Sequence, residues 1–246
     1  MDSSNPTRPA PIRGGIELPA RRQNIELLTE DGLTLVGELA VPESKEPAAT
    51  LVTLHPLPTA GGFMDSHILR KAAARLPELA DLAVVRFNTR GTSSARGTSE
   101  GSFDDGVAEQ HDVAAAMEFV QNRKLPHPWL VGWSFGTELA IKYGRQLAVD
   151  GVILLSPPLH RASEADLRAW ADDPRPFIVI VPEFDDYLRP EEARSRFAVV
   201  PHAHIVGVEG GKHLWVGEKL TYRVLTEIVN VVNPSALPLP TEYAAG

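Results

Sequence analysis

The chain has 246 residues, enough for one α/β domain with a sizeable core, and its 43% hydrophobic and 23% charged residues exclude wholesale disorder. Its formal net charge of −8, with no long run of Lys or Arg, argues against a nucleic-acid backbone or an anionic membrane as partner. The lack of cysteine excludes disulfides, cysteine nucleophiles and thiolate metal sites. Since no stretch has the apolar length of a signal peptide or membrane span, we expect a cytoplasmic protein.

The N-terminal part of the chain changes character at about residue 23. Residues 1–22 are rich in Pro, Ser, Gly and Arg without periodicity, which predicts a flexible arm or an extended lead-in. Residues 23–42 form two runs of alternating apolar residues that meet at Asp31-Gly32. Asp-Gly between such runs is a strong signal for an antiparallel hairpin.

After the hairpin, short apolar runs alternate with segments of helical periodicity. Buried strands are expected at 50–55, 82–88, 128–133, 151–156, 176–182 and 202–209. Helices are expected around 68–76 (after Asp65 or Ser66 as N-cap), 113–120, 139–147 and 220–232, with a short helix between the fourth and fifth of these strands.

This alternation defines a fold class. It predicts a mostly parallel sheet with helices on both faces, to which the hairpin adds an antiparallel edge. One domain is expected over 23–233, followed by a C-terminal tail over 234–246. In such sheets the functional site lies beyond the carboxyl ends of the strands, so the loops there should carry the chemistry.

One of these loops reads Gly132-Trp133-Ser134-Phe135-Gly136, at the junction of a predicted strand and helix. The pattern is weak alone, but this setting is the one that a nucleophile elbow requires. The two glycines leave room for strand and helix to approach, while the helix N-terminus favours developing negative charge. The alternative is an ordinary strand-to-helix turn in which Ser134 caps the helix.

A serine nucleophile needs a base, and the base needs an orienting acid. In elbow proteins the acid and then the histidine follow the serine, each after a strand. Asp185-Asp186 follow the strand expected at 176–182, and His213 follows the last strand behind two glycines. Aspartates after strands are often caps and lone histidines are often structural, but three residues in this order favour a triad.

The loop after the first buried strand is the second place where chemistry is expected. An oxyanion is held by two backbone N–H groups, one of which should be that of Phe135, directly after the nucleophile. The other should come from this loop, where Pro56 and Pro58 have no amide hydrogen and Leu57 is therefore the best donor. The alternative is a rigid Pro-rich turn without a catalytic role.

Metal binding is not expected. His202 and His204 share one face of the last strand by alternation, but no carboxylate partner is evident beside them. We therefore predict neither a metal nor an organic cofactor.

With these motifs, the chain resembles the α/β-hydrolase superfamily over 23–232. The segments "HPLPTAGGFMDS" and "RFNTRGTSSARGTSEGSFDDG" are similar to the oxyanion-loop and post-strand signatures of small members without a cap, a group of dienelactone-hydrolase-like and esterase- or thioesterase-like enzymes. The resemblance implies the nucleophile Ser134, the acid Asp185, the base His213 and the oxyanion amides of Leu57 and Phe135.

The chain departs from the family pattern at three positions. Pro56 stands where many relatives have glycine, and Asn88 where many have aspartate; both bear on loop geometry and substrate preference. Pro182 takes the usual glycine position before the acid. Counting from Pro182 favours Asp185 as the acid, whereas counting back from the next proline favours Asp186.

The resemblance implies a serine hydrolase that transfers the acyl group of a small ester or thioester to water. Only one short helix fits between the strands at 151–156 and 176–182, where many relatives insert a lid, so an open site is expected. Its candidate apolar walls are Trp133, Phe135, Leu57, Phe63 and Trp215. A peptidase on this fold normally carries a further domain, and a non-catalytic binding protein commonly lacks a triad member. Both remain as alternatives, and the sequence specifies neither the substrate nor the oligomeric state.

Overall fold

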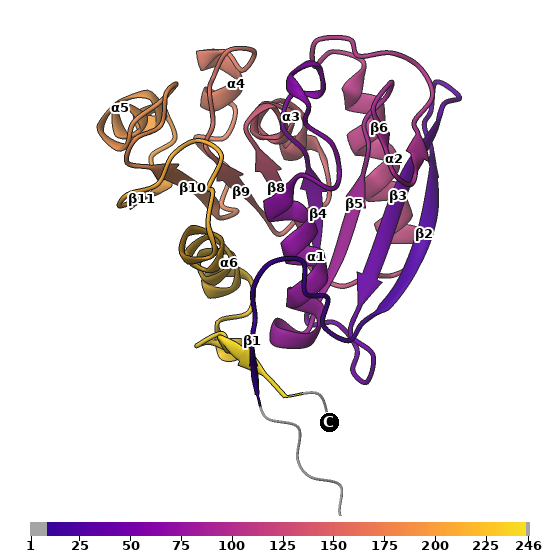
Figure 1. The fold of residues 1–246 in the computed structure, drawn as a ribbon. Helices are drawn as coiled ribbons and strands as arrows, with labels where there is room; N and C mark the ends of the chain where they lie inside the picture. Colours follow the sequence, from indigo (N-terminus) through magenta and orange to yellow (C-terminus); the bar gives the residue numbers. More distant parts are fainter. Residues whose placement is uncertain (1–8, 245–246) are drawn as a thin grey trace, which may run out of the picture.

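The computed structural model describes residues 9–244, and their main feature is one eight-stranded sheet (Figure 1). The strand order is β11-β10-β9-β8-β4-β5-β3-β2. The strands are β2 (Arg21–Leu28), β3 (Thr34–Val41), β4 (Ala49–Leu54), β5 (Leu82–Phe87), β8 (Pro128–Trp133), β9 (Gly151–Leu155), β10 (Phe177–Pro182) and β11 (His204–Val208).

Pairing within the sheet confirms the predicted topology. The six strands from β11 to β5 run parallel to their neighbours, while β3 pairs antiparallel with both β5 and β2. Every residue of β4, β5, β9 and β10 is buried, as expected of strands covered on both faces. The carboxyl ends of the parallel strands therefore all lie at one edge of the sheet.

Helices cover both faces of the sheet. The hydrophobic cluster on one face includes residues of α1 and α6, and the cluster on the other includes residues of α2, α3, α4 and α5 (Figure 1). The helices are α1 (His67–Ala80), α2 (Glu109–Asn122), α3 (Phe135–Tyr143), α4 (Glu164–Arg168), α5 (Pro190–Arg196) and α6 (Glu218–Val232).

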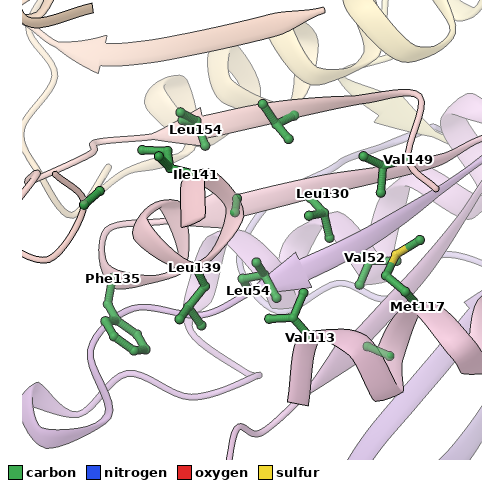
Figure 2. Close-up of a cluster of buried hydrophobic side chains, with 14 of the residues drawn as sticks. Val52, Leu54, Val113, Met117, Leu130, Phe135, Leu139, Ile141, Val149 and Leu154 are labelled. Atoms are coloured by element: carbon green, nitrogen blue, oxygen red, sulfur yellow. The ribbon is translucent and has the colours of Figure 1, made fainter. Parts of the chain in front are cut away.

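The core beneath α2 and α3 fixes the position of α3 and therefore of the loop before it. Leu139 and Ile141 of α3 and Val113 of α2 have at most 1% of their surface exposed. Figure 2 shows these side chains with apolar residues of β4, β8 and β9. Burying a side chain of this size is worth about 1.5–3 kcal/mol, so α3 is anchored strongly against the sheet.

Short elements complete the chain. They are the 3-10 turns η1 (Pro58–Ala60), η2 (Gly144–Gln146), η3 (Phe197–Val199) and η4 (Pro234–Ala236), and the two-residue strands β6 (Ser93–Ser94) and β7 (Gly97–Thr98), which pair with each other in the loop after β5.

The structure differs from the predicted helices in three places. The helix after Ser134 ends at Tyr143 and continues as a 3-10 turn, so Leu147 lies beyond it. Ser66 precedes α1, but its hydroxyl accepts the N–H of Phe63 instead of a helix amide. A further helix, α5, was not predicted from the sequence. It begins at Pro190, because proline is well suited to the first helical position.

The two ends of the described chain meet. Ala10–Pro11 (β1) pairs antiparallel with Glu242–Tyr243 (β12), at the bottom of Figure 1. The arm and tail expected over 1–22 and 234–246 therefore contain paired strands, which their composition did not indicate; residues 1–8 and 245–246 lie outside the described part.

The strand edge that carries the predicted site is open. Between β9 and β10 the only helix is α4, and no cap domain is present in residues 9–244 (Figure 1). In the same range, no helix combines the length and apolar character that a membrane crossing requires.

Candidate active site

Ser134 lies in the sharp turn between β8 and α3. Its backbone has φ 52° and ψ −117°, a conformation that costs a non-glycine residue about 1–3 kcal/mol. Its N–H donates to the carbonyl of Leu155 at 2.9 Å, while its carbonyl accepts from both the N–H (2.9 Å) and the hydroxyl (2.7 Å) of Thr137. The backbone groups of Ser134 are thus hydrogen-bonded within the turn, and the turn directs the hydroxyl beyond the edge of the sheet.

The glycines on either side of Ser134 allow this turn. A Cβ at Gly132 would lie 2.4 Å from the carbonyl oxygen of Gly136, and a Cβ at Gly136 would lie 2.1 Å from the carbonyl oxygen of Leu54. Both distances are far below van der Waals contact, so any larger residue would force β4, β8 and α3 apart. The spacing observed in the sequence is therefore a steric requirement of the turn.

The structure brings Ser134, His213 and Asp185 together in one chain of hydrogen bonds. The hydroxyl of Ser134 lies 2.9 Å from Nε2 of His213, and Nδ1 of His213 lies 2.9 Å from Oδ2 and 3.1 Å from Oδ1 of Asp185. All three are buried, with 9%, 8% and 3% of their surfaces exposed respectively. Asp186, the alternative acid, is exposed, and the hydrogen bonds of His213 Nδ1 go to Asp185 instead.

The local structure holds both partners of Ser134 in place. Asp185 accepts the N–H groups of Tyr187 (2.9 Å) and Leu188 (3.3 Å), which directs its carboxylate away from solvent. The carbonyl of His213 accepts the indole N–H of Trp133 (3.2 Å) and the hydroxyl of Ser156 (3.3 Å). A carboxylate at Nδ1 keeps the proton on that nitrogen, so Nε2 presents its lone pair to Ser134.

Two backbone N–H groups beside Ser134 have no protein acceptor. Within residues 9–244, neither the N–H of Leu57 nor that of Phe135 donates a hydrogen bond, and both residues line the cavity that Ser134 faces. The loop of Leu57 folds back tightly, since a Cβ at Gly62 would lie 2.0 Å from the carbonyl oxygen of Pro56. These are the two residues that the sequence indicated as donors.

His55 fixes the start of this loop. Its Nδ1 lies 2.7 Å from the carbonyl oxygen of Pro56, and its Nε2 accepts the N–H of Thr89 at 3.1 Å, which requires the neutral ring with its proton on Nδ1. Complete burial lowers the pKa of His55 to about 4. The neutral imidazole therefore ties the loop after β4 to the loop after β5.

The cavity at Ser134 is small and has walls of mixed polarity. Its volume is about 150 Å³, comparable to a cavity that accepts benzene. Two large side chains at the mouth, Tyr187 and Leu214, have 52% and 57% of their surfaces exposed. The lining residues are Pro56, Leu57, Ala60, Ser134, Phe135, Glu138, Pro158, His160, Arg161, Tyr187, His213 and Leu214.

Of the five expected apolar walls, Leu57 and Phe135 line this cavity and the other three do not. Trp133 and Trp215 are buried in the core under α1 and α6, with 2% and 0% of their surfaces exposed. Phe63 lines a separate depression beside η1 and the loop after β5. Trp133 is next to Ser134 in sequence and Trp215 is two residues after His213, yet both side chains enter the core on the α1 and α6 face of the sheet. Proximity in sequence does not show which face of the sheet a side chain enters.

Seven residues at the cavity were not singled out from the sequence, and four of them have polar side chains: Glu138, His160, Arg161 and Tyr187. Glu138 could have been noticed as an acid four positions after Ser134 in an otherwise apolar helix turn. The other three lie in the loops after β9 and β10. Only their position after the carboxyl ends of these strands could have indicated that they lie near the site.

His202 and His204 are exposed at the β11 edge of the sheet. Among residues 9–244, no group of three or more His, Asp or Glu side chains is arranged to hold a metal ion.

The chain has few recognisable relatives by sequence. No family model matches the chain. An uncharacterized protein of Rickettsia prowazekii (strain Madrid E) is 27% identical over 151 residues, which cover 60% of this chain; the match spans about three fifths (61%) of that relative's length.

Solved structures match over most of the chain. An α/β serine hydrolase without a lid from Xanthomonas campestris is 25% identical, with a TM-score of 0.72 over 91% of this chain and 99% of the other. An α/β serine hydrolase homologue from Coxiella burnetii is 22% identical, with a TM-score of 0.72 over 85% and 96% of the two chains. A Pyrococcus furiosus esterase is 17% identical, with a TM-score of 0.66 over 90% and 98%.

These likenesses agree with the overall α/β architecture and, for the protein from Xanthomonas campestris, with the uncovered strand edge. They support a hydrolase of the α/β fold. The chain therefore has the α/β-hydrolase fold, and residues 9–244 carry no lid.

Proposed function

We propose that this protein is a serine hydrolase that cleaves a small ester or thioester through an acyl-enzyme. The observation that carries the proposal is the buried hydrogen-bonded chain from Ser134 through His213 to Asp185, beside the two unpartnered N–H groups. Neighbouring structures described as serine hydrolases and an esterase support the same class of reaction.

In the proposed mechanism, Nε2 of His213 accepts the proton of the Ser134 hydroxyl as the serine oxygen attacks the substrate carbonyl. Asp185 orients the imidazole and stabilises its protonated form. The N–H groups of Leu57 and Phe135 donate to the developing oxyanion, each worth about 3–4 kcal/mol in the transition state.

The intermediate then breaks down in two steps. His213 returns its proton to the leaving alcohol or thiol, which leaves the acyl group on Ser134. A water molecule enters through the uncovered edge and loses a proton to Nε2 as it attacks the acyl-enzyme. As the second tetrahedral intermediate collapses, His213 returns this proton to the oxygen of Ser134, which releases the carboxylic acid and restores the free enzyme.

The experiment is a kinetic comparison of p-nitrophenyl butyrate, a butyryl thioester and a peptide p-nitroanilide in wild type and variants. We expect turnover of an ester or thioester, with kcat/KM reduced by at least about a thousandfold in Ser134→Ala and in His213→Ala. Activity that persists in Ser134→Ala would contradict the mechanism. Cleavage of the anilide in preference to both esters would favour a peptidase instead.

A further inference from the structure

The loop that carries His213 contains a strained residue, so contacts from other elements must hold it. Trp215, two residues after His213, has a φ of 53°, a left-handed conformation that is unfavourable for a bulky side chain. Its indole is fully buried, which anchors the loop on that side. Such a conformation persists only where the surrounding structure over-determines it. The groups that bind this loop therefore bear on the position of the His213 imidazole.

Two successive carbonyls of this loop are held by side chains from other parts of the fold. The carbonyl of His213 accepts from the indole of Trp133 and the hydroxyl of Ser156. The next carbonyl, that of Leu214, lies 2.6 Å from Nε2 of His67, the first residue of α1. Since a carbonyl can only accept, Nε2 of His67 carries the proton and donates it.

A second contact places the ring of His67. The ring meets the indole of Trp133 edge-on, with the centroids 5.3 Å apart and the planes at 90°, a favourable arrangement for two aromatic rings. Partial burial lowers the pKa of His67, so at neutral pH the ring is uncharged and the proton on Nε2 is its donor. The indole that holds the carbonyl of His213 thus also supports the imidazole that holds the carbonyl of Leu214.

We infer that His67 is a positioning residue for the triad: through the carbonyl of Leu214, it keeps Nε2 of His213 directed at Ser134. This rests on the proposed function. His67 does not line the cavity at Ser134, so it acts through the loop and not on the substrate. The His213–Ser134 contact is 2.9 Å, and a misplacement of about 1 Å at such a contact can cost about a hundredfold in rate.

Both acylation and deacylation use His213, so loss of the donor should slow the two steps alike and leave KM nearly unchanged. His67→Gln and His67→Met form a matched pair of similar length, of which only the first has an N–H to offer the carbonyl of Leu214. With p-nitrophenyl butyrate, we expect kcat to fall at least about tenfold in His67→Met, with KM within about twofold of wild type. His67→Gln should stay within about threefold of wild type in both values.

Two further variants separate the ring from the donor and control for the change itself. His67→Phe keeps a ring against Trp133 but has no donor, so it should lose as much kcat as His67→Met. It also serves if His67→Met does not fold. His204→Phe, at an exposed histidine of β11, should change neither kcat nor KM.

A second measurement requires no substrate. The Nδ1 proton of His213, held by Asp185, gives a separate downfield signal in the ¹H NMR spectrum while it is protected from exchange with water. We expect this signal in wild type and in His67→Gln. It should be broadened or absent in His67→Met, although the far-ultraviolet circular dichroism of that variant matches wild type.

Three results would overturn the inference: wild-type kcat in both variants without a donor, equal losses of kcat in His67→Gln and His67→Met, and an unaltered His213 signal in His67→Met. The proposed function fails in a different way, through wild-type protein that turns over no ester or through turnover that does not require Ser134. In that case the NMR signal of His213 still tests whether His67 positions this histidine.

Discussion

Gly136→Ala tests whether the turn around Ser134 is sterically required. The new Cβ would lie 2.1 Å from the carbonyl oxygen and 2.5 Å from the carbonyl carbon of Leu54. Relief requires α3 and the end of β4 to separate by about 1 Å, an overpacking change that costs about 3 kcal/mol or more. Alanine regains about 1 kcal/mol of helix propensity, so the net loss of unfolding free energy should be at least about 2 kcal/mol.

The assay is urea unfolding followed by circular dichroism, together with ester hydrolysis. With a denaturant slope of about 3 kcal/mol per molar, the midpoint of Gly136→Ala should fall by at least about 0.7 M. Activity should fall too, because β4 leads directly into the loop of Leu57. The control is Gly207→Ala, whose Cβ would meet Pro190 at an ordinary 3.4 Å and should shift the midpoint little. A Gly136→Ala protein with the wild-type midpoint and activity would refute the steric reasoning.

Three further predictions concern the site and its support. Asp185→Asn should lower kcat/KM by about 10³–10⁴, while Asp186→Asn stays within twofold; equal losses would contradict the assignment of the acid. Because burial lowers the pKa of His55 to about 4 from an unfolded value near 6.5, the unfolded state binds more protons between these values. Unfolding free energy should therefore drop by about 1.4 kcal/mol per pH unit from 6.5 to 4, and this slope should be reduced in His55→Gln; an unchanged slope would exclude His55 as its cause. Asp112→Ala removes a fully buried carboxylate bonded to the main chain and guanidinium of Arg90, and should cost about 3–5 kcal/mol in urea unfolding; a loss below 1 kcal/mol would show that Arg90 finds other partners.

The fold was predictable because its signals are local and repeated. Runs such as 177–182 are apolar throughout and alternate with helical spacing, and the hairpin turns at Asp31-Gly32 as predicted. The pairing of 10–11 with 242–243 was not predictable, since two-residue strands carry no periodicity. The helix ends early, at Tyr143, and Gly144 follows it; glycine is common at helix ends, but here the apolar spacing of Leu139, Tyr143 and Leu147 outweighed that signal.

The candidate site could be predicted only in part, for related reasons. Ser134, Asp185 and His213 each follow a strand, and parallel strands bring their carboxyl ends to one edge, so position along the chain indicated proximity. The cavity walls depend on which layer each side chain enters. Trp133 and Trp215 enter the core under α1 and α6, whereas loop residues far from Ser134 in sequence close the cavity.

The most direct test of the central claim is labelling with a fluorophosphonate probe, followed by mass spectrometry of the modified peptide. The probe reacts with an activated serine without requiring the substrate to be known. The account predicts one label per chain on Ser134, absent in Ser134→Ala and strongly slowed in His213→Ala. A folded wild-type protein that does not react, or a label on another serine, would contradict it.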